Sequence, residues 1–390
     1  DRGDVPQAVR AAMWLGMLLV LRGRMAPAQG WFGRAGQLLD DAGIECAETG
    51  RVLAVQGLAA LHRDPGRALE LFQEAVRLAR TYGTGQAHVR LGDPASGCPR
   101  FDEAMVLATS GRDVSPVAVG IVYCAVVLEC QRILDLRRAQ EWTRELDRWS
   151  ADQQGLAPFR GQCLVHRSEM AQLRGDWDAA EQEADHACRH VADPAGDPVM
   201  GLAMYQRAEL HRLRGELDDA EAAYDQAVAH GHRDTPGRQR LLWQRGELQA
   251  AAASIRRVVE EEQGALQRAR DLDALVDITL AAGDPAAART GADGLQDLAG
   301  RVGTPMVEAV ATRAAAALDL ADGRVDDAVA GARRAVAAWQ ELGVPYEVAR
   351  SNEVLAAACA ARGDQLASEA ARRAALHVFR ELGANVDTAR

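Results

Sequence analysis

The sequence predicts an all-α fold, a right-handed superhelical solenoid of about ten helical hairpins with a period of about 40 residues. The pattern Gly-x4-Ala-x6-Ala recurs along the chain, intact at four places and altered at six others. Six of the nine spacings between these copies match this period closely, which is typical of stacked helical repeats. Almost no segment alternates apolar and polar residues with the period of a strand. The copies begin at Gly23, Arg63, Gly92, Leu134, Gly175, Gly215, Gly246, Gly283, Gly323 and Gly363.

Each position of the pattern has a physical role in a helical hairpin. A Gly such as Gly175 can take the left-handed conformation that ends a helix without a Cβ penalty. An acidic residue such as Asp176 follows it and suits the positive N-terminus of the next helix. Ala180 is small enough to let two helices approach, and Ala187 lies two turns further along the same face. The plan resembles the tetratricopeptide repeat, lengthened from its usual ~34 residues to about 40.

We expect one elongated array over residues 1–390, with two irregular short repeats near 83–100 and 230–246. The spacing between copies is clearly shorter from Arg63 to Gly92 and from Gly215 to Gly246 than elsewhere. Residues 92–99 are rich in Gly, Pro and Ser, which predicts a loop. Each irregular place is either a hinge or ligand site, or a deletion that the array tolerates, and the sequence leaves both alternatives open.

The composition excludes several classes of protein. None of the 45 basic residues is Lys, which excludes P-loop hydrolases, protein kinases and enzymes that form a Schiff base with Lys. A net charge of −11, spread over the repeats, argues against direct binding of nucleic acid. Seven Cys without a CxxC pair indicate the reduced, buried thiols of a cytoplasmic protein. The longest uncharged apolar stretch, residues 117–128, is too short to span a membrane, and we expect no signal peptide.

No group of residues in the sequence identifies a catalytic or a metal site. His186 and His190 share a helix face at i and i+4, but no third ligand lies near them in the sequence. We expect no metal there, none at His230 and His232, and no bound cofactor. The motifs of serine hydrolases and dinucleotide-binding enzymes are absent. The Trp residues are expected to lie in the core between repeats: Trp14, Trp31, Trp142, Trp149, Trp177, Trp243 and Trp339.

Several long stretches of the chain resemble one family. They are VSPVAVGIVYCAVVLECQRILDLRRAQEWT, FRGQCLVHRSEMAQLRGDWDAAEQEA, YQRAELHRLRGELDDAEAAYDQA and AWQELGVPYEVARSNEVLAAACAARGD, with CAETGRVLAVQGLAAL and FDEAMVLATSG nearer the N-terminus. These stretches are similar to the repeat-rich regulatory half of actinobacterial LuxR-type transcriptional regulators. The chain departs from that family at residues 82–92 and 231–245, which are the two irregular places.

In that family the array ends in a phrase like FRELGA, found here at residues 379–384, and a helix-turn-helix domain that binds DNA follows. The chain ends at Arg390, where that domain would begin. The resemblance therefore implies that DNA is bound by a longer parent protein through a domain that these residues do not contain.

We expect a sensor or protein-interaction module that binds a small molecule or a partner protein in its concave groove, with a homodimer as a further possibility. First helices of hairpins usually line such a groove, which selects five candidate residues: Tyr123, Arg167, Tyr205, Arg207 and Tyr346. Two alternatives stay open. One is a stand-alone repeat scaffold, and the other is an enzyme of a natural-product pathway, which needs a deep pocket with converging polar groups.

Overall fold

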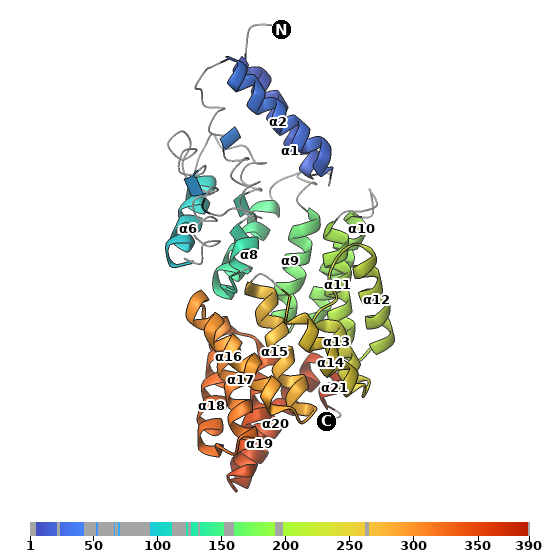
Figure 1. Cartoon of the computed structure of the whole chain (residues 1–390), viewed down its shortest axis with the longest axis vertical. Helices are drawn as coiled ribbons and strands as arrows, with labels where there is room; N and C mark the ends of the chain where they lie inside the picture. Colours follow the sequence, from blue (N-terminus) through green and yellow to red (C-terminus); the bar gives the residue numbers. More distant parts are fainter. Residues whose placement is uncertain are drawn as a thin grey trace. The chain divides into compact units, whose positions relative to one another are not determined.

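A computed structural model shows helices packed as antiparallel neighbours along the chain (Figure 1). The chain divides into two compact units. One consists mostly of residues 1–129 and 144–160, and the other, the C-terminal unit, of residues 130–143, 161–193 and 197–390. A single array over residues 1–390 stays a prediction. The structure describes residues 5–21, 24–42, 52–53, 66, 69–70, 94–110, 122–123, 126–131, 133–151, 160–191, 198–261 and 265–388.

Helices account for most of the residues that the structure describes, and no strand is found among them. None of the described helices is both long enough and apolar enough to span a bilayer. The helices are α1 Val5–Leu21, α2 Met25–Ala42, α6 Pro94–Ser110, α8 Leu136–Ala151, α9 Arg160–Leu173, α10 Trp177–Val191, α11 Pro198–Arg214, α12 Leu217–Ala229, α13 Gly237–Gln244, α14 Leu248–Val258, α15 Ala265–Ala281, α16 Pro285–Val302, α17 Pro305–Ala321, α18 Val325–Leu342, α19 Pro345–Ala361, α20 Gln365–Leu382 and α21 Asn385–Thr388.

The predicted turns of the hairpins are confirmed wherever the structure describes them. The six anchor glycines from Gly175 to Gly363 all have positive φ angles, between 76° and 87°. Leu134, a weak copy of the pattern without Gly, also has a positive φ of 60° and is the one non-Gly residue of this kind in the described ranges. The register of the repeat therefore identified a left-handed position that composition alone would not. The copies beginning at Gly23, Arg63 and Gly92 start outside the described residues.

The predicted close packing of the small residues is also confirmed. Both alanines of the copy at Gly175, Ala180 and Ala187, have no solvent exposure. The equivalent alanines in the other intact copies are equally buried: Ala28, Ala35, Ala220, Ala227, Ala328 and Ala335. Where the helices approach this closely, no room is left for a larger side chain.

The prediction that all Trp residues lie in the core was partly wrong. Trp177 and Trp339 are buried, but Trp14 on α1 and Trp31 on α2 are more than 40% exposed. The helical period places an aromatic residue on a face, but only the neighbouring elements decide whether that face is covered.

A bulky residue at Ala220 is expected to destabilise the C-terminal unit. Ala220 packs in a buried cluster with Tyr224 and Leu241, so Ala220→Leu overpacks the hairpin and lowers the free energy of unfolding by about 1–3 kcal/mol. Urea denaturation measures this change. The matched control is Ala222→Leu, two residues along the same helix and exposed, which is expected to stay within about 0.5 kcal/mol of wild type. Equal midpoints for the two variants would show that the repeat register is misplaced.

The loop expected at residues 92–99 was wrong over the part that the structure describes. Helix α6 begins at Pro94 and continues through Pro99. Pro94 suits a first helical position because its missing N–H has no partner there in any helix. Phe101 and Met105 lie one turn apart and are completely buried, so burial of this face outweighs the cost of Pro99. The rest of that irregular repeat, residues 82–93, lies outside the described residues.

The second irregular repeat contains a shortened first helix. Helix α13 has 8 residues, whereas α11 and α15 on either side have 17 each. It follows a cis peptide bond between Thr235 and Pro236. The Thr235 carbonyl accepts hydrogen bonds from Tyr205 Oη at 3.1 Å and from Gln267 Nε2 at 2.9 Å, which anchor the segment to both neighbouring hairpins. The short repeat is thus held in one place in this structure.

Candidate functional site

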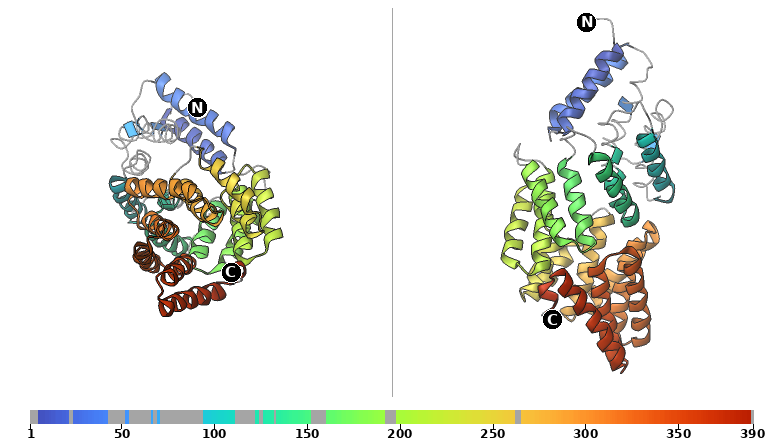
Figure 2. Two further views of the ribbon diagram at one scale, coloured as in Figure 1. Left: turned by 60° about the horizontal axis from the view of Figure 1, so that its bottom comes forward. Right: turned by 180° about the vertical axis from the view of Figure 1, so that it is seen from behind.

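The last hairpin of the C-terminal unit packs against the first hairpins of the same unit. Phe379 on α20 shares a buried apolar cluster with Trp177 on α10 and with Leu210 and Leu213 on α11. Asn385 Nδ2 donates a hydrogen bond to the carbonyl oxygen of Arg214, 171 residues earlier, at 2.9 Å. Figure 2 shows α21 beside the green helices that begin this unit. The stack of hairpins therefore turns back on itself, and its inner face borders a common interior.

A pocket of about 160 Å³ lies on this inner face. Most of its lining comes from first helices of hairpins, namely α9, α11, α13, α15, α17 and α19. Four aromatic residues contribute to its wall: Trp177, Tyr205, Trp339 and Tyr346. Pro236 and Arg240 of the shortened repeat also line it, so the second irregular place borders the pocket.

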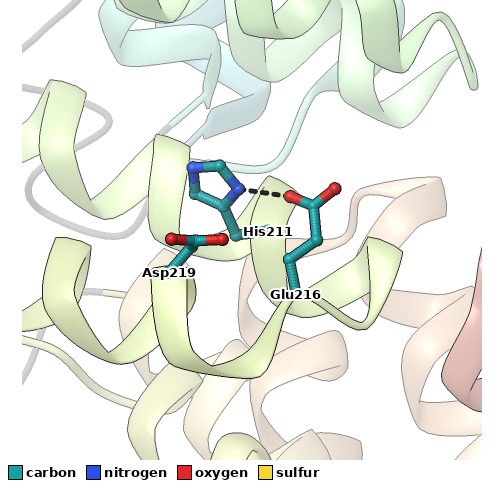
Figure 3. A group of neighbouring side chains, drawn as sticks. All are labelled: His211, Glu216 and Asp219. Carbon is teal, nitrogen blue, oxygen red and sulfur yellow. Dashed lines mark hydrogen bonds and ion pairs between the residues drawn. The ribbon is translucent and has the colours of Figure 1, made fainter.

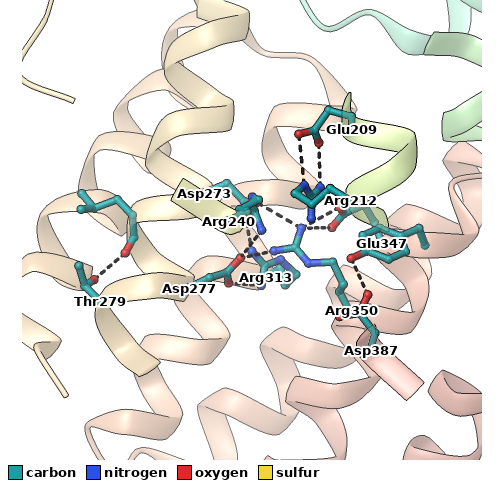
Figure 4. Close-up of polar contacts among 12 residues, drawn as sticks. Glu209, Arg212, Arg240, Asp273, Asp277, Thr279, Arg313, Glu347, Arg350 and Asp387 are labelled. Carbon is teal, nitrogen blue, oxygen red and sulfur yellow. Dashed lines mark hydrogen bonds and ion pairs between the residues drawn. The ribbon is translucent and has the colours of Figure 1, made fainter. Parts of the chain in front are cut away.

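Asp273, which lines the pocket, and Asp277, which does not, organise a buried ion-pair network (Figure 4). Asp273 and Asp277 lie one turn apart on α15, and arginines from three other helices contact both of them. Arg240 on α13 lies 2.7 Å from Asp273 and 3.3 Å from Asp277. Arg313 on α17 and Arg350 on α19 each contact both carboxylates as well. One pair of carboxylates therefore joins four successive first helices.

Further ion pairs extend this network along the wall of the pocket. Arg350 also contacts Glu347 at 2.7 Å, one turn earlier on α19. On α11, Arg212 donates two hydrogen bonds to Glu209, at 3.2 and 2.8 Å, and Tyr224 Oη donates a third to the same carboxylate. Buried charges of this kind are stable only because each is paired and hydrogen-bonded.

The network shifts the protonation of its acids. Burial by itself would raise the pKa of Asp273, but Arg313, Arg350 and Arg240 outweigh it and hold this pKa well below its usual range. Asp277 behaves in the same way, with its pKa also lowered by Arg313 and Arg350 against the effect of burial. Asp273 and Asp277 therefore stay ionised and paired with arginines at neutral pH.

Two buried side chains near the pocket have hydrogen-bonding atoms without a protein partner. Trp339, only 1% exposed, lines the pocket, and its Nε1–H has no acceptor among the described residues. Neither ring nitrogen of the buried His166 has a hydrogen-bond partner there either, although Nδ1 lies 3.8 Å from Glu169, which lines the pocket. An unpaired buried donor is costly, so an acceptor atom that reached the Nε1–H of Trp339 would stabilise the protein.

The five residues selected from the sequence fall into three places. Tyr205 and Tyr346 both line the pocket. Arg167 and Arg207 form ion pairs with residues of α10, at 2.6 Å to Glu183 and 3.1 Å to Asp185, and do not line it. Tyr123 belongs to the other unit, where its ring packs against Trp149 with the centroids 5.6 Å apart.

The sequence interpretation missed the ion-pair network. The sequence does contain a signal for this network, because Asp273 and Asp277 interrupt a mostly apolar helical run of Ala, Leu, Val and Ile residues. Charged residues at i and i+4 on such a buried segment need partners. Which arginines supply them depends on the stacking of separate hairpins, and no local pattern marks them.

Comparisons with known proteins add little. No family model matches the chain, and no curated protein matches it. Among solved structures, the chain is similar to the human IFIT1 dimer with m7Gppp-AAAA, at 13% identity and a TM-score of 0.35, over 93% of this chain and 80% of that one. At this TM-score the likeness supports no inference. The assignment rests on the hairpins themselves. The chain is an all-α helical-repeat protein.

Proposed function

We propose that the C-terminal unit is a sensor that binds a small, neutral, largely apolar molecule in the pocket, within a regulator of the LuxR type. The observation that carries this proposal is a largely apolar pocket whose arginines each lie within 4 Å of a carboxylate and whose lining residues include Trp339, with its unpaired Nε1–H. Ligand pockets in proteins commonly combine an apolar lining with a few placed polar groups.

The size of the pocket favours a small molecule over a partner protein. A cavity of ~150 Å³ in another protein holds benzene, so about 160 Å³ suits a molecule with a single ring. The return of the last hairpin onto the first ones leaves less open groove for a protein segment than a simple solenoid offers. A stand-alone scaffold that binds proteins is therefore the less favoured alternative.

The ion pairs favour a neutral ligand. Arg212, Arg240, Arg270 and Arg350 line the pocket, and each already contacts at least one carboxylate, Arg270 at 3.8 Å from Glu169. A charged ligand would have to break such a pair, and separating a buried pair costs about 3–5 kcal/mol. A carbonyl or ether oxygen that accepts from Trp339 requires no such loss.

Two features support a regulatory role. The quoted sequence stretches resemble the regulatory half of LuxR-type regulators. The pocket is lined by residues from successive hairpins, so a ligand that prefers one spacing of these hairpins shifts the array towards the corresponding curvature. Such a change is a means of signalling to another domain of the same protein.

Three ring compounds of similar size test the ligand class. Acetophenone has an acceptor oxygen, ethylbenzene has none, and benzoate carries a charge. Isothermal titration calorimetry is expected to show binding of acetophenone about tenfold tighter than of ethylbenzene, because only acetophenone pairs the Trp339 donor. Benzoate is expected to bind most weakly. Trp339→Phe removes the donor and is expected to abolish the preference while ethylbenzene still binds.

The matched control is Trp14→Phe, which changes an exposed Trp in the other unit and is expected to leave all three affinities unchanged. Tighter binding of benzoate, equal binding of acetophenone and ethylbenzene by wild type, or no binding at all would each contradict the proposal. Native mass spectrometry of the purified chain under gentle and then denaturing conditions would identify a natural ligand that travels with it.

A further inference from the structure

We propose that His211, Glu216 and Asp219 form a binding site for a divalent transition-metal ion, with Zn²⁺ as the best match. This site is separate from the pocket and lies at the turn between α11 and α12 (Figure 3). The three side chains come from the last turn of α11, the residue before α12 and the first turn of α12.

The geometry brings three suitable ligand atoms together. His211 Nδ1 and Glu216 Oε2 are 2.5 Å apart, and one ligand atom from each of the three residues lies within 4.8 Å of the others. In a tetrahedral zinc site the ligand atoms are about 3.4 Å apart, given Zn–N and Zn–O bonds of about 2.1 Å. Small rotations of the exposed Glu216 and Asp219 side chains are enough to reach that spacing.

The turn itself is fixed, which favours a preformed site. Gly215 has a φ of 85°, and the Glu216 N–H donates to the carbonyl oxygen of His211 at 2.9 Å. The site therefore spans only nine residues on a backbone that the repeat already orders, so little conformational entropy is lost when a metal binds.

The equivalent turns of the same solenoid show what is special here. In three of them an Asp follows the Gly and caps the next helix: Asp176, Asp284 and Asp364 each accept a hydrogen bond from the N–H three residues later, at 3.0 to 3.1 Å. Glu216 makes no such bond, and its carboxylate reaches His211 instead.

The turn at Glu247 shows that a Glu at this position does not by itself bring metal ligands together. Glu247 also makes no capping bond, but Leu242 and Ala250 occupy the positions that His211 and Asp219 occupy here. Among the turns that the structure describes, the combination of a His, a Glu and an Asp occurs at this one.

The turn at Gly323 has Asp319, Arg324 and Asp327 at the three positions, and Arg324 pairs with Asp319 at 2.6 Å. An Arg there excludes a metal, whereas all three residues of the turn at Gly215 can act as metal ligands.

The ligand set selects the kind of metal. One imidazole and two carboxylates suit Zn²⁺ and related ions better than Mg²⁺ or Ca²⁺, which prefer oxygen ligands alone. Two carboxylates would also neutralise the charge of a divalent ion. Three protein ligands leave a fourth position for water, and the bound ion would fasten α11 to α12.

Isothermal titration calorimetry with ZnCl₂ tests the site in the whole chain, and absorption of bound Co²⁺ reports its geometry. One ion per chain is expected, with the tetrahedral visible bands of Co²⁺. A Zn²⁺ concentration one hundred times the measured Kd is expected to raise the Tm of the C-terminal unit by about 5 °C. Asp219→Asn and His211→Gln are each expected to remove this binding event and this rise in Tm.

The matched control is His377→Gln, which removes the exposed His of another His–Glu pair, with Glu381 at 3.3 Å. This variant is expected to bind Zn²⁺ like wild type. Asp219 is exposed, so Asp219→Asn is expected to fold normally, and circular dichroism checks this. Unchanged Zn²⁺ stoichiometry and affinity in Asp219→Asn or in His211→Gln would overturn the proposal, as would an octahedral Co²⁺ spectrum in wild type.

Discussion

Replacement of Asp273 by Asn is expected to lower the free energy of unfolding of the C-terminal unit by about 3–5 kcal/mol. The substitution keeps the shape of the side chain but removes the charge that Arg313, Arg240 and Arg350 share. Arg313 is only 3% exposed, so its guanidinium would be left in the interior with half of its compensating charge. Urea denaturation followed by circular dichroism measures the change.

An exposed ion pair provides the control for this prediction. Glu261 pairs with Arg233 at 2.5 Å, and both side chains are largely in contact with solvent. Glu261→Gln is expected to change stability by at most about 1 kcal/mol, because water screens an exposed pair. A loss at Asp273 no larger than the loss at Glu261 would show that the buried network contributes little to the fold.

The same network predicts how stability depends on pH. The pKa of Asp273 and of Asp277 is lowered in the folded protein, so their contribution is complete above the unfolded value of about 3.9. This contribution to stability is lost as the pH falls below about 3.9 and passes through the lower pKa values of the folded protein. The stability of wild type is therefore expected to fall steeply below about pH 4, and Asp273→Asn is expected to have a shallower dependence in that range.

The sequence was sufficient to predict the local structure of the solenoid. The left-handed φ of Gly175 and of Leu134 follows from the repeat register, because every hairpin needs a reversal at that position. The burial of Ala180 and Ala220 follows from the same register, because two helices can approach only where side chains are small. Each of these features depends on residues that lie within one or two repeats of each other.

The candidate site was predictable only in part, because it depends on contacts between distant repeats. Tyr205 and Tyr346 were selected as residues of first helices, and the pocket brings them together across 141 positions. Arg350 contacts Asp277 across 73 positions, and no local pattern in the sequence pairs them. The curvature that brings such residues together accumulates over several hairpins, each with its own small rotation. A single sequence contains no direct measure of that curvature.

The contact between the last and first hairpins is expected to contribute several kcal/mol to the free energy of unfolding. Phe379 is fully buried, and its ring centroid lies 5.7 Å from that of Tyr346, which in turn lies 6.0 Å from that of Trp177. Phe379→Ala removes the end of this aromatic series and leaves a cavity, so the free energy of unfolding is expected to fall by about 3–5 kcal/mol. Leu366→Ala on the same helix, where the side chain is 83% exposed, is expected to change it by less than about 0.5 kcal/mol.

Hydrogen exchange distinguishes a loosened closure from a general loss of stability. If the aromatic series holds the last hairpin against the first ones, Phe379→Ala speeds exchange in α20, α21 and the facing turns of α10 and α11 more than in α15 and α16. Uniform faster exchange throughout the unit would instead mean that the closure has no independent stability. Because Tyr346 also lines the pocket, selective loosening would couple the closure to ligand binding, and a ligand in the pocket would then slow exchange in α21 of the wild type.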